Sequence, residues 1–198
     1  MSTVVVVQKD GRIAIGADTL NKYGNLKLHD SYKVDSSKIL QFQDTYLALV
    51  GPTVHFDVLS SLFRRYPEHI SFANREAIFE TYVALHPILK EDYFVNPAAG
   101  KDADYESSQI EALIANPNGI FGMYSWRSVV QYSRFFSIGS GREYALGAMQ
   151  AVYDQLPADQ IAEVGLTAAC EFDDSSAAPL EIHGMALVAG ELQAAAAV

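Results

Sequence analysis

The sequence predicts an α+β protein with four layers, an αββα sandwich in which two antiparallel sheets lie between two pairs of helices. The expected strands and helices come in blocks along the chain, which argues against a parallel βαβ arrangement. The run Val4–Val7 is apolar without alternation, which indicates a strand buried on both faces. Two sheets packed face to face, each covered by helices, explain both observations.

Length and composition indicate one globular domain, expected over residues 1–190, with a short Ala-rich tail over 191–198. The net charge of -10 repels phosphate groups, so we expect neither nucleic acid nor an anionic membrane as a partner. The sequence shows no secretory signal and no apolar run of membrane-spanning length, and we expect a cytoplasmic protein. The single cysteine, Cys170, excludes a disulfide within the chain.

The first part of the chain is predicted to form two hairpins and then two helices. Asp10-Gly11 is a hairpin-turn signal, because glycine tolerates positive φ. Helical spacing of apolar residues predicts the helices, the second capped by Asn74 and disturbed near its end by Pro87. The expected elements are strands Thr3–Gln8 and Arg12–Ala17, a loop or short edge strands over 21–37, strands Lys38–Gln43 and Tyr46–Val50, and helices Val54–Arg65 and Asn74–Leu89.

The second part is predicted to return to the sheets and then to form a second helix pair. A weakly patterned loop is expected over Asn96–Tyr105, and Asn116–Gly119 is a further hairpin-turn signal. The expected elements are strands Gln109–Ala115 and Gly119–Tyr124, a segment Val129–Ile138 that continues the same sheet, helices Arg142–Leu156 and Ala158–Glu171, and a last strand Leu180–Val188.

The N-terminus offers a possible catalytic group. Methionine is usually removed before small residues, so we expect a mature chain that starts at Ser2. The Ser2 hydroxyl would then lie beside its own α-amine, whose unperturbed pKa of about 7.7–8.0 suits a general base at neutral pH. Nucleophile and base would come from one residue. Met-Ser begins many proteins, so this feature alone is weak evidence.

Five short motifs, in order along the chain, strengthen the case for Ser2. Together they resemble proteasome β subunits and the bacterial HslV peptidase, which are N-terminal-nucleophile (Ntn) hydrolases. The first two hairpins look most similar to the bacterial proteasome homologues. The motifs are Ser2–Val7, Gly16-Ala17-Asp18, Ser37-Lys38-Ile39-Leu40, Ile138-Gly139-Ser140-Gly141, and Ala168–Asp173 followed by Ser175-Ser176.

The resemblance implies a role for each matching position in the first half of the chain. Ser2 takes the place of the family's N-terminal threonine as nucleophile, and Asp18 pairs with a lysine. We expect Lys38 to be that lysine, since the strand that follows it matches the family, while Lys33 remains an alternative. Serine lacks the methyl group that restricts χ1 of threonine, so slower catalysis is expected.

The remaining implied roles concern the terminal amine and the oxyanion. Ser140 and Asp173, together with Ser176, are expected to hold the Ser2 amine and to relay protons, with Asp174 as an alternative one residue away. The family's oxyanion donor is a backbone N–H, usually of a glycine on the strand before the first helix. Our alignment of the motif Tyr46–Gly51 gives this role to Ala48.

The implied activity is hydrolysis of peptide bonds through an acyl-ester on Ser2, by a homo-oligomer of stacked rings. The most similar branch suggests seven-membered rings, and six remain open. The chemistry needs no cofactor, and the sequence gives no sign of an ATPase unfoldase. His29, His55, His69, His86 and His183 lack ligand spacing, so no metal site is expected. Two alternatives remain: a catalytically inactive ring subunit, and a small-molecule amidase of the same fold.

Overall fold

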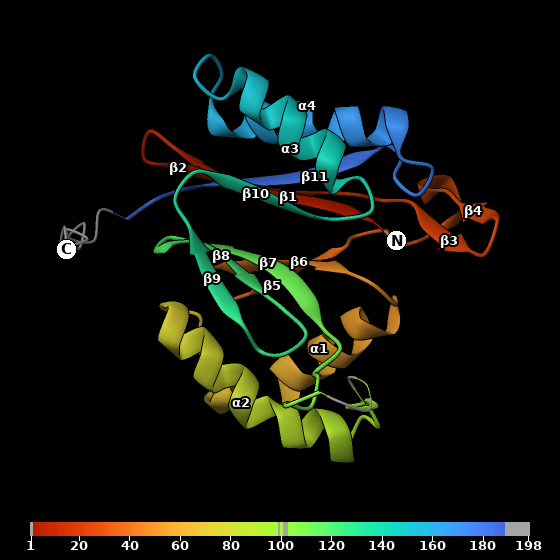
Figure 1. Ribbon diagram of the computed structural model, residues 1–198, viewed down its shortest axis with the longest axis vertical. Coiled ribbons are helices and arrows are strands. Elements are labelled where there is room, and N and C mark those ends of the chain that lie inside the picture. Colours follow the sequence, from red (N-terminus) through yellow and green to blue (C-terminus); the bar gives the residue numbers. More distant parts are fainter. Residues whose placement is uncertain (1, 99, 101–102, 189–198) are drawn as a thin grey trace.

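The computed structural model describes residues 2–98, 100 and 103–188, so the expected tail over 191–198 lies outside the described residues. The chain forms four layers, seen edge-on in Figure 1. Helices α3 (Arg142–Val152) and α4 (Ala158–Phe172) cover one sheet, and α1 (Val54–Arg65) and α2 (Arg75–Glu91) cover the other. The αββα sandwich expected from the sequence is therefore confirmed.

The first sheet has four antiparallel strands in the order β10-β1-β2-β11. The Asp10-Gly11 turn that joins β1 to β2 has positive φ at both residues, as a tight hairpin requires. Strand β1 is an inner strand of this sheet and lies between β10 and β2. The strand bounds are β1 Thr3–Lys9, β2 Arg12–Asp18, β10 Phe135–Gly139 and β11 Leu180–Ala186.

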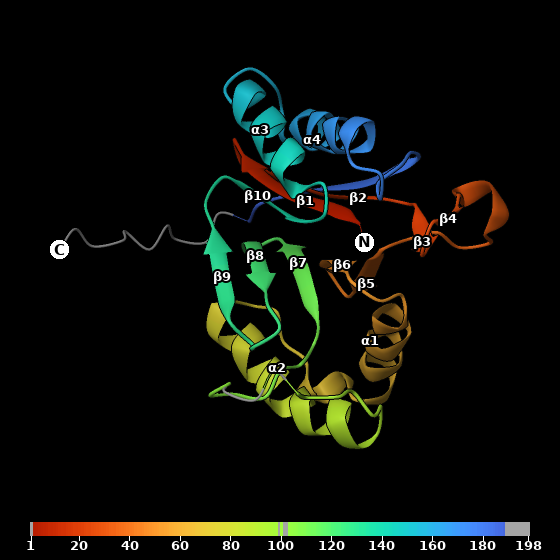
Figure 2. The same ribbon diagram turned by 45° about the vertical axis from the view of Figure 1, so that its right-hand side comes forward.

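The second sheet has five antiparallel strands in the order β5-β6-β7-β8-β9. A separate two-stranded hairpin, β3–β4, projects from the body of the molecule near the N-terminal end of β1 (Figure 2). This hairpin lies within the segment 21–37 that was expected to hold short edge strands. The bounds are β3 Asn21–Tyr23, β4 Leu26–Leu28, β5 Ile39–Phe42, β6 Thr45–Val50, β7 Glu111–Asn116, β8 Gly119–Met123 and β9 Val129–Tyr132.

Three expected boundaries were wrong. The segment Val129–Ile138 is not one strand of one sheet: β9 pairs with β8 in the second sheet, whereas β10 pairs with β1 in the first. Helix α2 continues through Pro87 to Glu91, two residues past its expected end, and the fully buried Leu85 and Leu89 hold it against the sheet on both sides of the proline. Helix α3 ends at Val152, where a turn replaces the expected last helical turn.

The strand β1 is buried on both faces, as its unbroken apolar run predicts. Val4 and Val6 pack in the core between the two sheets, while Val5 and Val7 pack in the core under α3 and α4. A third core lies between the second sheet and α1 and α2. The strand is thus fixed from two sides, and Ser2, which precedes it, is held at the edge of the inter-sheet core. No helix of the described residues is long and apolar enough to cross a membrane.

Candidate active site

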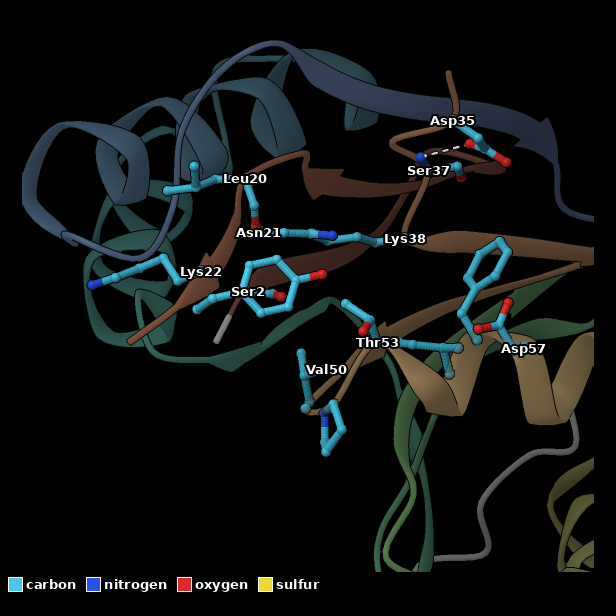
Figure 3. A pocket seen from close by; sticks show the side chains of 15 residues that line it. Ser2, Leu20, Asn21, Lys22, Asp35, Ser37, Lys38, Val50, Thr53 and Asp57 are labelled. Carbon is cyan, nitrogen blue, oxygen red and sulfur yellow. Dashed lines mark hydrogen bonds between the residues drawn. The ribbon is translucent and has the colours of Figure 1, made fainter. Parts of the chain in front are cut away.

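Ser2 lies at the entrance of the inter-sheet space and is only 6% exposed. Its carbonyl oxygen accepts a hydrogen bond from the Ser140 N–H (2.9 Å), which fixes the backbone at the start of β1. A cavity of about 700 Å³ opens beside it and is lined also by Lys38 and by the segment between β6 and α1 (Figure 3). A side chain at position 2 is thus held rigidly at the edge of a space large enough for part of a peptide.

Asp18 and Lys38 form a buried ion pair beside this position. Lys38 Nζ lies 2.8 Å from Asp18 Oδ1 and donates a second hydrogen bond to the Leu20 carbonyl oxygen at 2.6 Å. Asp18 Oδ1 also accepts from the Thr3 N–H (2.9 Å), so the same carboxylate anchors the residue that follows Ser2. Burial lowers the pKa of Lys38, and the charge and hydrogen bond of Asp18 offset part of that effect.

Lys33, the alternative lysine, has a different place. Its Nζ donates to the Thr19 carbonyl oxygen at 2.5 Å, and it is not among the residues that line the cavity. Lys38 both lines the cavity and contacts Asp18. Of the two lysines, the geometry therefore favours Lys38 as the partner of Asp18.

Asp173 joins two hydroxyl groups on the other side of Ser2. Asp173 Oδ2 accepts hydrogen bonds from Ser140 Oγ and Ser176 Oγ, both at 2.7 Å, and Ser140 Oγ lies 3.5 Å from the Ser2 carbonyl oxygen. Asp174, the alternative, instead forms an exposed ion pair with Lys22 at 3.0 Å. The structure thus brings Ser140, Asp173 and Ser176 together next to Ser2, and it places Asp174 outside this group.

Thr3, the residue after Ser2, has its polar groups occupied. Its Oγ1 lies 2.7 Å from Ser176 Oγ and accepts from the Gly141 N–H at 3.1 Å. Its N–H donates to Asp18, as described above. Thr3 is fully buried, so its hydroxyl serves to fasten β1 to the loop that carries Ser140.

Two glycines permit the close approach of this loop to Ser2 and Thr3. Gly139 has a φ of +104°, and a Cβ built there would overlap the Ser2 carbonyl oxygen. A Cβ built on Gly141 would overlap Thr3 Oγ1. The Gly-Ser-Gly motif is therefore needed for steric reasons at both glycines.

Ala48, the expected oxyanion donor, does not line the cavity. It is fully buried in β6, where its neighbours across the sheet are Ile39 and Leu113. The N–H of the next residue, Leu49, donates to the Lys38 carbonyl oxygen on the β5 side (2.9 Å). Because successive residues of an antiparallel strand direct their backbone groups to opposite sides, the Ala48 N–H faces β7 and Leu113. It therefore points into the sheet and away from Ser2.

Gly51, three residues after Ala48, lies on the cavity wall. It follows β6 directly, lines the cavity and has a φ of +102°, a conformation that favours glycine. Among the described residues, no group accepts a hydrogen bond from its N–H. Gly51 was not among the site residues expected from the sequence, because the alignment of the motif Tyr46–Gly51 favoured Ala48, three residues earlier. The signal was available: Gly51 is the glycine nearest to the start of α1.

Two further titratable groups lie near the cavity without lining it. His55, on the first turn of α1, is buried, which lowers its pKa, and its Nδ1 has no hydrogen-bond partner among the described residues. Cys170 lies on α4, and burial raises the pKa of its thiol to about 11, so it remains a thiol at neutral pH. Neither group is poised to act as a nucleophile.

A four-layer αββα sandwich with a hydroxyl group held at the start of an inner strand is the architecture of an Ntn hydrolase of the proteasome type. No family model matches the chain, and no curated protein sequence matches it. Among solved structures, the Thiobacillus denitrificans bacterial proteasome homologue (BPH) is 40% identical. Its TM-score is 0.88, with 95% of this chain and 100% of that chain covered. The same protein in complex with epoxomicin gives 40% identity, a TM-score of 0.87 and coverage of 94% and 99%.

The chain belongs to the bacterial proteasome homologue family, among the HslV-like Ntn hydrolases. Eukaryotic HslV from Trypanosoma brucei shares the fold at 16% identity, with a TM-score of 0.66 and coverage of 93% of this chain and 99% of that one. The chain is thus a proteasome-type subunit, and the family expected from the motifs is confirmed.

Proposed function

We propose that this protein is an Ntn peptidase whose nucleophile is Ser2 after removal of Met1. The observation that carries the proposal is that two pairs of side chains meet at the start of β1: Asp18 with Lys38 at the Thr3 N–H, and Ser140 with Asp173 at the Ser2 carbonyl oxygen. The relative that is 40% identical has been solved in complex with epoxomicin, which supports an inhibitor-accessible site in this family.

The reaction has two steps, formation of an acyl-ester on Ser2 and hydrolysis of that ester. Ser2 Oγ attacks the carbonyl carbon of the peptide bond, and its proton passes to the free Ser2 amine, directly or through water and Ser140. The C–N bond then breaks, and the leaving amine takes that proton. Water attacks the resulting ester, releases the acyl product and returns a proton to Ser2 Oγ. The Lys38 ammonium favours the deprotonated forms of the Ser2 hydroxyl and amine.

The proposed oxyanion donor is the N–H of Gly51 rather than that of Ala48. The Gly51 N–H belongs to the cavity wall and has no partner among the described residues, whereas the Ala48 N–H faces β7. A donor that is not already bonded is what stabilisation of a developing negative charge requires. Ser140, Asp173 and Ser176 are proposed to hold the Ser2 amine and relay protons.

We also propose that the subunits form a cytoplasmic homo-oligomer of stacked rings, with seven subunits per ring, acting on peptides or unfolded proteins. The support is membership in a family of proteasome homologues, together with the large exposed apolar side chains around the projecting hairpin, such as Tyr23 and Leu26. Native mass spectrometry measures the number of subunits. A monomer at working concentration would contradict this part of the proposal.

The test of the catalytic proposal is peptide hydrolysis by the wild type and by Ser2→Ala, with Thr3→Ser as the matched control. We expect Ser2→Ala to lose activity and Thr3→Ser to retain it, because Ser keeps the hydroxyl that contacts Ser176. Equal activity of wild type and Ser2→Ala would overturn the proposal. If the ring is intact but no peptide is hydrolysed, the result would favour a catalytically inactive subunit. If only small amides are hydrolysed, the result would favour an amidase.

A further inference from the structure

We propose that the cavity beside Ser2 selects substrates with a lysine or arginine side chain on the residue that precedes the cleaved bond, an inference that rests on the proposed function. The cavity wall carries four charged side chains, Lys22, Asp35, Lys38 and Asp57. The two cations and the two carboxylates differ in one respect, which is whether each has an ionic partner. The charged groups without an ionic partner determine which side chains of a substrate the cavity attracts.

Both cations of the wall are already neutralised by partners. Lys38 is paired with the fully buried Asp18 at 2.8 Å, and Lys22 is paired with Asp174 at 3.0 Å. Each lysine thus already has a carboxylate partner within the protein, and an acidic side chain of a substrate would have to compete with that partner.

The two carboxylates have no such partners. Within the described part of the chain, neither Asp35 nor Asp57 forms an ion pair. Asp35 Oδ1 accepts only from the Ser37 N–H, at 2.9 Å. In Figure 3, Asp35 and Asp57 both lie on the side of Lys38 that is away from Lys22, one above and one below Lys38 in this view. Among the described residues, the charged groups of the cavity wall that have no ionic partner are therefore both negative, which favours a cationic side chain of a substrate.

The wall of the same cavity is partly apolar. Leu49, Val50 and Phe56 line the same cavity. Lysine and arginine have an apolar stem and a cationic end group, so such a side chain can lie along the apolar wall with its charge at the carboxylates. A glutamate would be repelled there, and a leucine would leave the carboxylates without a partner.

Asp57 also has a structural explanation that needs no substrate. It lies in the first turn of α1, where a negative charge interacts favourably with the helix dipole. The two explanations give different results, since a helix-stabilising role affects all substrates alike, whereas a binding role affects only cationic ones.

The experiment measures kcat/KM of the purified assembly with fluorogenic peptides that differ only in the residue before the cleaved bond, which is Arg, Leu or Glu. We expect the order Arg, Leu, Glu. We expect Asp57→Asn to lower kcat/KM for the Arg peptide roughly fivefold to tenfold through a higher KM, and to leave the Leu peptide unchanged. Asp35→Asn should act in the same direction, and Asp154→Asn, an exposed change outside the cavity, should have no effect.

Preference for Leu or Glu in the wild type would overturn the inference, as would equal losses for all three peptides in Asp57→Asn. The preference for Arg should also weaken in high salt, because the carboxylates are exposed. Failure of the inference and failure of the proposed function are distinguishable. An epoxomicin adduct on Ser2 without basic selectivity refutes the inference alone, whereas absence of both hydrolysis and adduct refutes both.

Discussion

Asp18 and Lys38 form a buried ion pair, 2.8 Å between Oδ1 and Nζ, that also fixes the start of β1 through the Thr3 N–H. Burial lowers the pKa of Lys38, and Asp18 raises it again in part. Lysine is a cation below its pKa, so its assistance to Ser2 is present at lower pH and is lost as the pH rises past that lowered pKa. The proposed activity should therefore decline on the alkaline side before an exposed lysine would titrate.

Asp18→Asn should move this alkaline decline to lower pH. The substitution removes the negative charge that raises the pKa of Lys38, so the ammonium loses its proton at lower pH. A profile of kcat/KM from about pH 6 to about pH 11 measures the shift. An unchanged alkaline limb would show that Lys38 does not control it.

Lys38→Met should also destabilise the fold, by about 3 kcal/mol, because it leaves the fully buried Asp18 carboxylate without its cation. Chemical denaturation measures the free energy of unfolding, and Lys27→Met, an exposed change on β4, is the control. Equal stability of the two variants would contradict a structural role for the ion pair.

Gly139→Ala should displace Ser2 and reduce both activity and stability. A Cβ at this position overlaps the Ser2 carbonyl oxygen, and φ is +104°. Gly147→Ala in α3 is the matched control, because a Cβ there meets no atom within 4 Å. It should stabilise the helix by about 0.5–1 kcal/mol. Unchanged hydrolysis in Gly139→Ala would indicate that the position of Ser2 is not critical.

Asp173→Ala should lower kcat while Asp174→Ala leaves it unchanged. Asp173 orients Ser140 and Ser176, whereas Asp174 contacts Lys22 at the surface. Steady-state kinetics with the Leu peptide separates the two residues, and comparable losses in both variants would refute the proposed hydroxyl network.

Gly51→Ala and Ala48→Gly distinguish the two candidates for oxyanion donor. Gly51→Ala strains a residue at φ +102° and displaces its N–H, so kcat/KM should fall about 100-fold. Ala48→Gly should change kcat/KM by less than about threefold, because the Ala48 N–H faces β7. The reverse pattern would restore Ala48 to the role first expected.

Much of the fold could be predicted because its signals are local. The apolar run Val4–Val7 and the turn at Asp10-Gly11 identify the first hairpin, and Asn74 caps α2 through its contact with the Ala77 N–H, as expected. The assignment of β9 and β10 to different sheets could not be predicted. Only the positions of the partner strands, far away in the sequence, determine where the chain passes from one sheet to the other.

The candidate site likewise has features that local sequence motifs predict and features that depend on strand pairing. Asp18, Lys38 and Ser140 belong to distinctive motifs, and the structure brings them together around the start of β1; their catalytic roles stay predictions. The choice between Ala48 and Gly51 depended on which way successive N–H groups point, and this alternation is set by strand pairing and not by composition. The place of Gly51 just before α1 is visible in the sequence, but the direction of the Ala48 N–H is visible only once β6 is seen between β5 and β7.

The most direct test of the central claim is intact and peptide-level mass spectrometry of the protein incubated with epoxomicin. The account predicts that Met1 is absent and that one inhibitor is attached to the residue-2 segment of the wild type, with no adduct on Ser2→Ala. Retention of Met1, or an adduct that persists in Ser2→Ala, would contradict Ser2 as the nucleophile.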